Sequence, residues 1–205
     1  MIQLKLIIFI CLLSKLNAIS PNAYFVNNAT LVAPNNYLLY WNYTTTSITF
    51  KAVVKTTGWF GFGLSPDGGM ANSDLVVAYL NENRSVNFTG RYVASSPSLP
   101  IINKVQYWKM LHYSQNNGYT TAIFSRNLTV CNAAHTIAIV PGTLFVIFAW
   151  GSSFTSNSLF KDIKYHSPAN RSSTSLPLTS TINQKITLNM NQIQTVDFRV
   201  NVKIS

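Results

Sequence analysis

The chain has 205 residues, of which 47% are hydrophobic and only 10% are charged, with a formal net charge of +10 at pH 7. This length allows one domain with a sizeable core. The basic residues are scattered and form no run interleaved with aromatic residues, which argues against a nucleic-acid-binding protein. The net positive charge leaves an anionic binding partner as an alternative.

The N-terminus predicts a secreted protein. Lys5 precedes an apolar run at residues 6–13, and Ala18 ends a candidate cleavage site. This run is shorter than the roughly 20 residues that span a bilayer, although an N-terminal membrane anchor is the alternative. We expect residues 1–18 to be a signal peptide that includes Cys11. The remaining chain is then secreted or lies in the lumen of the secretory pathway, without a transmembrane segment.

N-glycosylation sequons are consistent with secretion. They begin at Asn28, Asn42, Asn83, Asn87, Asn127 and Asn170. Each predicts a surface position that could carry a glycan in a secreted protein.

Strand patterns follow along the chain. An aromatic segment at 37–43 comes after the turn Pro34-Asn35-Asn36, and residues 47–55 alternate apolar with polar side chains. Further strands are predicted at 86–92, 108–114, 119–126 and 144–150, with a hairpin turn at 116–118. Pro141 and Gly142 divide the apolar stretch 137–150 into two short strands of a buried hairpin, which we favour over a membrane helix. Short strands separated by turns predict an all-β antiparallel β-sandwich.

The most informative segment is residues 58–70, GWFGFGLSPDGGM, followed by the apolar strand at 75–78. Aromatic strand formers alternate with small glycines, and residues 66–69 have turn composition. We expect Trp59, Phe62, Phe50, Phe124 and Trp150 in or near the interface between the two sheets. Asp74 starts the next strand, where it could cap the preceding turn or, with Asp67, bind a cation; we favour the cap.

This segment resembles the DOMON domain, in the version found at the N-terminus of the dopamine β-monooxygenase-like, copper type II ascorbate-dependent monooxygenases. The likeness continues in order through 38–42, 106–108, 124–131, 145–151 and 165–176. It implies a DOMON β-sandwich at residues 25–180. It also implies that residues 181–205 form a linker that would lead into a copper monooxygenase domain, which this chain lacks.

Copper hydroxylation in the resembling proteins requires two sites rich in imidazole ligands. This chain has three histidines, His112, His135 and His166, in none of the close spacings that such sites use. It also has no G-x-S-x-G motif. We therefore expect no catalytic residues and no autonomous hydroxylase activity. His112 and His135 are expected to be surface or loop histidines.

Met70 and His166 are the candidate cofactor ligands. In haem-binding members of the DOMON superfamily, a methionine after the glycine-rich turn and a histidine in a late loop hold haem b, and these two residues occupy similar positions. Lys55, Lys164 or Arg171 could then neutralise the propionates. In the alternative, Met70 fills a gap between the sheets and His166 bonds to a loop. A binding site for a sugar or a metal ion is a further alternative.

Cys131 is the only cysteine after the predicted signal peptide. The resemblance implies a disulfide to a cysteine of the absent C-terminal part, so we expect a free thiol or an intermolecular bridge; a buried, inert thiol is the alternative. The predicted function is a secreted ligand-binding or interaction module, with a second copy, a copper monooxygenase domain, a small ligand or a glycan as partner. Alternatives are a haem b electron-transfer domain, a glycan-binding module, or a fragment of a full copper monooxygenase.

Overall fold

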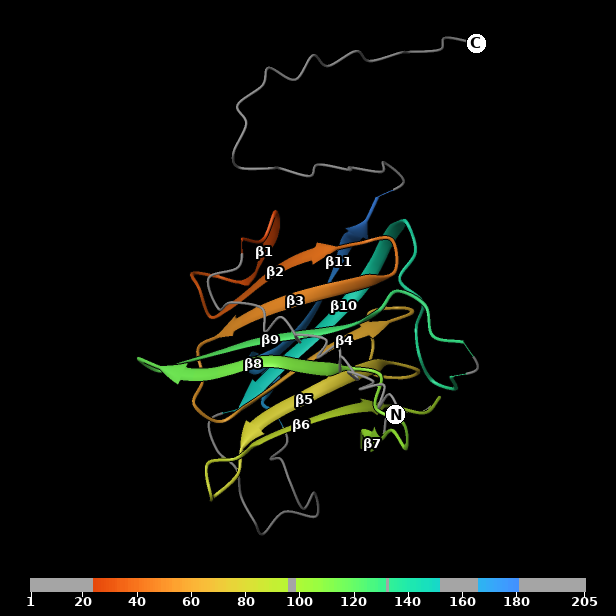
Figure 1. The fold of residues 1–205 in the computed structure, drawn as a ribbon. Coiled ribbons are helices and arrows are strands. Elements are labelled where there is room, and N and C mark those ends of the chain that lie inside the picture. Colours follow the sequence, from red (N-terminus) through yellow and green to blue (C-terminus); the bar gives the residue numbers. More distant parts are fainter. Residues whose placement is uncertain (1–23, 96–98, 132, 152–165, 181–205) are drawn as a thin grey trace, which may run out of the picture.

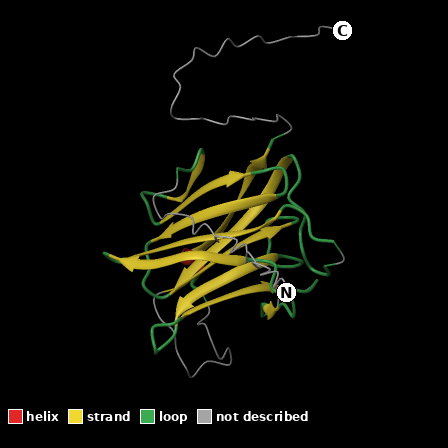
Figure 2. Ribbon diagram, viewed as in Figure 1, coloured by secondary structure: helices red, strands yellow, loops and turns green. Residues whose placement is uncertain are grey.

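The structure is a computed structural model that describes residues 24–95, 99–131, 133–151 and 166–180. The predicted signal peptide at 1–18 and the predicted linker at 181–205 lie outside these residues, as does Lys164. The described chain forms strands and one short 3-10 helix, η1 (Pro168–Asn170), with no α-helix in those ranges (Figure 2).

The strands form two antiparallel sheets that pack as layers (Figure 1). The five-stranded sheet has the order β1 (Asn27–Val32), β2 (Tyr37–Tyr43), β3 (Ser47–Val54), β9 (Tyr119–Asn127) and β8 (Lys109–Asn116). The six-stranded sheet has the order β11 (Arg171–Thr179), β10 (Gly142–Gly151), β4 (Trp59–Ser65), β5 (Asp74–Leu80), β6 (Val86–Tyr92) and β7 (Ile101–Ile102). The predicted all-β sandwich is confirmed.

Local sequence explains most of these elements. In β3, burial alternates so that Ile48, Phe50, Ala52 and Val54 all face the core. The β8–β9 hairpin turns at Asn117 and Gly118, whose φ angles are 50° and 79°. Two successive positive φ angles match the right-handed twist of the flanking strands, and asparagine and glycine adopt them most readily.

The core between the sheets is aromatic. The Phe50 ring lies 4.8 Å from Phe62 and 5.7 Å from Phe124, measured between ring centroids. Phe62 and Phe124 are themselves 5.6 Å apart, and all three side chains are buried. Trp150 belongs to the same cluster. These four members of the predicted interface are confirmed.

The prediction for Trp59 is wrong, because this side chain lies on the opposite face of its sheet. Adjacent strand residues point to opposite faces, and Phe60, Phe62 and Leu64 fill the core between the sheets. Trp59 must therefore point outward, where it belongs to a second buried cluster.

The predicted hairpin across Pro141 and Gly142 is also wrong: only β10 forms, and it begins at Gly142. The residues before Pro141 use their backbone donors elsewhere. Ile137 donates to the Asp74 carboxylate, and Ile139 donates to the carbonyl of Leu128. These bonds take the place of a strand ladder.

Candidate functional site

The six-stranded sheet carries buried apolar side chains on the face that points away from the sandwich core. We call this set the outer-face cluster; its members are Trp59, Leu75, Val77, Tyr79 and Ile147 on the sheet and Val93 just after β6, each no more than 8% exposed. The outer face of an antiparallel sheet is usually polar and solvated. The outer face of this sheet therefore departs from that pattern, since its apolar side chains are shielded from water.

Two glycines of β4 lie within this face. Gly61 pairs with Val77 and Ala149, and Gly63 pairs with Leu75 and Ile147. A methyl group at Gly63 would lie only 2.6 Å from Cβ of Leu75, whereas at Gly61 its nearest neighbours would be 3.6 Å away. Beyond Trp59, the glycines leave the outer face of β4 without side chains, while the neighbouring strands carry apolar ones.

Met70 is positioned by a tight turn after β4. The Ser65 hydroxyl accepts from the amide of Gly68 (2.9 Å) and donates to the carbonyl of Gly69 (2.7 Å). The Ser73 hydroxyl donates to the carbonyl of Met70 (2.7 Å). These bonds direct the half-buried Met70 side chain onto the outer-face cluster. Met70 therefore does not fill a gap between the sheets, so that alternative is wrong.

His166 reaches the same cluster from the segment before η1. Its half-buried ring lies 6.3 Å from the Trp59 ring, between centroids. Burial lowers the pKa of His166 below its usual 6.5, and the positive charge of Arg171 lowers it further. The imidazole is therefore neutral at pH 7, which is the form that binds a metal. Met70 and His166, far apart in sequence, thus border one apolar cluster.

Residues 34–151, more than half of the chain, match the family model of the DOMON domain. The chain belongs to the DOMON family.

Among its relatives, this DOMON chain is 30% identical to MOXD1 homolog 2 of Drosophila melanogaster over 118 residues, which cover 57% of the chain and 15% of that relative. It is 27% identical to human DBH-like monooxygenase protein 1 over 173 residues, which cover 79% of the chain and 28% of the relative. The chain thus spans less than a third of the length of either relative.

Two solved structures share the fold. The cytochrome domain of cellobiose dehydrogenase from Myriococcum thermophilum superposes with a TM-score of 0.56 at 16% identity, covering 75% of this chain and 82% of that domain. The cytochrome b domain of pyranose dehydrogenase from Coprinopsis cinerea gives 0.51 at 16% identity, covering 68% and 74%. At this identity the likeness shows the fold alone.

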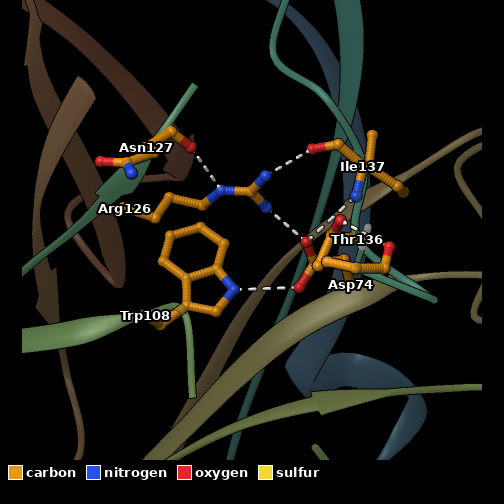
Figure 3. A network of polar contacts seen from close by, with 7 residues as sticks. Asp74, Trp108, Arg126, Asn127, Thr136 and Ile137 are labelled. Carbon is orange, nitrogen blue, oxygen red and sulfur yellow. Dashed lines mark hydrogen bonds and ion pairs between the residues drawn. The ribbon is translucent and has the colours of Figure 1, made fainter. Parts of the chain in front are cut away.

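A buried ion pair joins the two sheets of the DOMON sandwich (Figure 3). Asp74 on β5 accepts from Arg126 on β9, and both side chains are completely buried. Asp74 also accepts from the indole of Trp108 at 2.9 Å and from the amide of Ile137 at 3.2 Å. The second terminal nitrogen of Arg126 donates a hydrogen bond to the carbonyl of Ile137 at 2.7 Å.

This arrangement corrects the prediction for Asp74. The carboxylate neither caps the preceding turn nor joins Asp67 around a cation; its oxygens accept from the side chains and amide just named. Sequence reasoning missed the ion pair because Arg126 is distant in sequence. It also missed Arg91, which is buried on β6 and donates to the hydroxyl of Thr89 at 2.8 Å.

The remaining predicted residues lie away from the outer-face cluster or at the surface. Cys131 is exposed with a free thiol, so the alternative of a buried thiol is wrong. His135 is exposed beside Tyr92, their rings stacked at 3.9 Å, and His112 is half-buried on β8. Lys55 and Arg171 are exposed.

The six predicted glycosylation sites differ in accessibility. Asn28, Asn83 and Asn127 are exposed, whereas Asn42, Asn87 and Asn170 are half-buried. The Asn42 amide nitrogen, which would carry the glycan, donates to the carbonyl of Tyr24 at 2.7 Å. A glycan at Asn42 would have to replace that bond, while the exposed sites face no such cost.

The described residues contain no group of three or more His, Cys, Asp or Glu side chains placed to hold a metal ion. They also contain no helix that is long and apolar enough to cross a membrane.

Proposed function

We propose that this chain is a secreted DOMON module that binds a ligand at the outer-face cluster and has no hydroxylase activity of its own, and that the ligand is haem b. One observation carries the proposal: Met70 and His166 border the same buried apolar cluster. The cytochrome domains of two sugar dehydrogenases share the fold, which supports a haem ligand without deciding it.

The residues present fit haem in three respects. A thioether and a neutral imidazole are suitable axial ligands for haem iron. The side chains of the cluster that both residues border are apolar, as a porphyrin requires. Finally, a buried indole N–H of Trp59 has no acceptor among the described residues, as expected where a ligand group is to supply one.

Each residue would have a distinct role. Met70 and His166 would hold the iron, and the lowered pKa of His166 would keep its imidazole free of a competing proton at neutral pH. The outer-face cluster would bury the porphyrin and exclude water. A haem held by Met70 and His166 would supply one-electron transfer rather than oxygen activation.

The test is a haem titration of the purified mature chain followed by absorption spectroscopy. We expect stoichiometric binding with a low-spin, six-coordinate spectrum. Met70→Leu keeps an apolar side chain of similar size but removes the thioether, and should convert the spectrum to high spin. His166→Ala should abolish binding.

Matched controls come from the other sheet. Met110→Leu and His112→Ala remove the same chemical groups from β8 and should leave the haem spectrum unchanged. A spectrum that is unaltered in both Met70→Leu and His166→Ala would exclude this pair as the ligands. Failure of the unmodified chain to bind haem would refute the proposal as a whole.

A further inference from the structure

The indole nitrogen of Trp59 is a buried donor whose acceptor is missing from the described part of the chain. Trp59 is 3% exposed, and no hydrogen-bond partner of its Nε1 is found there. Two other buried tryptophans are satisfied: Trp41 donates to the carbonyl of Leu178 at 3.0 Å, and Trp108 donates to Asp74 at 2.9 Å. Tryptophan is a donor only, so leaving its N–H unpaired in the interior destabilises the protein.

Trp59 lies along the outer face of β4 and β10. Its ring carbon Cζ3 would be 3.6 Å from a methyl group at Gly61, and its Nε1 would be 2.3 Å from one at Gly151. The carbonyl of Gly151 already accepts from the hydroxyl of Thr56 at 2.6 Å. The N–H is thus held in place beside a glycine, at the edge of the cluster that His166 also contacts.

The surroundings of this N–H favour an anionic acceptor. Arg171 on β11 pairs with Ala149 on β10, and Ala149 packs against the outer-face cluster. Arg171 is close enough to His166 for its positive charge to act on the imidazole. Strand partners share a face, so Arg171 lies on the same outer face as Ala149. An N–H donor and a guanidinium on one sheet face suit a carboxylate, because hydrogen bonds to a charged acceptor are stronger than those to a neutral one.

We infer that the Trp59 Nε1–H donates a hydrogen bond to a carboxylate of the bound ligand, with Arg171 as the nearby countercharge. The inference rests on the proposed function and extends it, because haem b carries two propionate carboxylates. Trp59 then selects ligands that bear a carboxylate, in addition to packing against the porphyrin.

The experiment compares haem b with its dimethyl ester, which keeps the iron and porphyrin but has no carboxylate. Both are titrated into the full mature chain and into Trp59→Phe, which keeps an aromatic ring but has no N–H. Trp59→Phe should weaken haem b binding about tenfold, the usual worth of a hydrogen bond to a charged group, and leave ester binding unchanged. The low-spin spectrum should persist in every complex.

Trp41→Phe is the matched control, because its N–H has a protein acceptor. It should lower the thermal unfolding midpoint of the ligand-free chain without changing the preference for haem b over the ester. Trp59→Phe should show the reverse. Its thermal unfolding midpoint without ligand should be unchanged or raised, and it should lose the preference for haem b over the ester. Arg171→Gln, at an exposed position, should also reduce haem b binding selectively, and provides the test if Trp59→Phe does not fold.

The outcomes separate the two proposals. If the unmodified chain binds neither compound, the proposed function fails and this inference fails with it. If the chain binds haem b through Met70 and His166, but neither Trp59→Phe nor Arg171→Gln alters the ratio of the two affinities, the inference alone is overturned.

Discussion

At the scale of single residues, Asp74 forms a buried electrostatic link between the two sheets. Its two oxygens accept from Trp108, Arg126 and the amide of Ile137, and the Arg126 guanidinium lies 5.0 Å from the Trp108 ring. A charge this deeply buried is tolerated only when its partners satisfy it. The pair therefore fixes how β5 faces β9, although an apolar pair could be equally stable.

Removing one charge of this pair should be strongly destabilising. Asp74→Asn leaves the Arg126 guanidinium buried without its counterion, and we expect a loss of about 3–5 kcal/mol in the free energy of unfolding. Glu82→Gln, at an exposed acid, is the control and should change stability by less than about 0.5 kcal/mol. Urea denaturation measures both. Equal stability of the two variants would show that the ion pair does not stabilise the sandwich.

At the scale of elements, β4 separates the core from the candidate site. Its even-numbered residues Phe60, Phe62 and Leu64 fill the space between the sheets, and its odd-numbered residues face the outer-face cluster. Every residue of the strand is buried, so both faces are packed. A change in β4 register would exchange the two faces and destroy the core and the site together.

The two outward glycines of β4 allow a matched test of this packing. Gly63→Ala would place a methyl group 2.6 Å from Cβ of Leu75 and 3.2 Å from Cγ1 of Ile147, so we expect a loss of about 1–3 kcal/mol. Gly61→Ala would meet only ordinary contacts at 3.6 Å and should be neutral or slightly stabilising. Chemical denaturation of both variants checks this. Equal losses would mean that close packing around Gly63 is not what requires glycine there.

At the scale of the whole molecule, Cys131 exposes a thiol that could link two copies of the chain. Cys131 lies in the loop after β9, which is solvent-accessible, while the outer-face cluster is on the other sheet. A covalent bridge through Cys131 would therefore use no residue of the proposed ligand site. Haem binding and thiol chemistry are thus expected to be independent.

The state of Cys131 can be measured directly. We expect the native mature protein, kept unreduced, either to show one thiol that reacts quickly with a thiol reagent, or to run as a dimer that reduction converts to a monomer. Cys131→Ser should abolish both signals and leave the haem spectrum unchanged. A protein with neither a reactive thiol nor a reducible dimer would contradict the expectation.

The sequence by itself determined the all-β class, the DOMON likeness, most strand positions and the β8–β9 hairpin, because these depend on local alternation and turn chemistry. It also identified Met70 and His166 as candidates, through a resemblance to haem-binding members of the superfamily. The outward direction of Trp59 also follows from the sequence, because side chains alternate between the two faces of a strand and Trp59 and Phe62 therefore cannot share a face.

Only the tertiary structure decided which distant residues meet. That Met70 and His166 border one cluster follows from the pairing of β4 with β5 and β10, and that Asp74 finds Arg126 follows from how the two sheets stack. Residue patterns give the face on which a side chain lies but not the order of strands in a sheet. The physical reason is that sheet order is set by the joint burial of all strands, a property of the whole chain rather than of any segment.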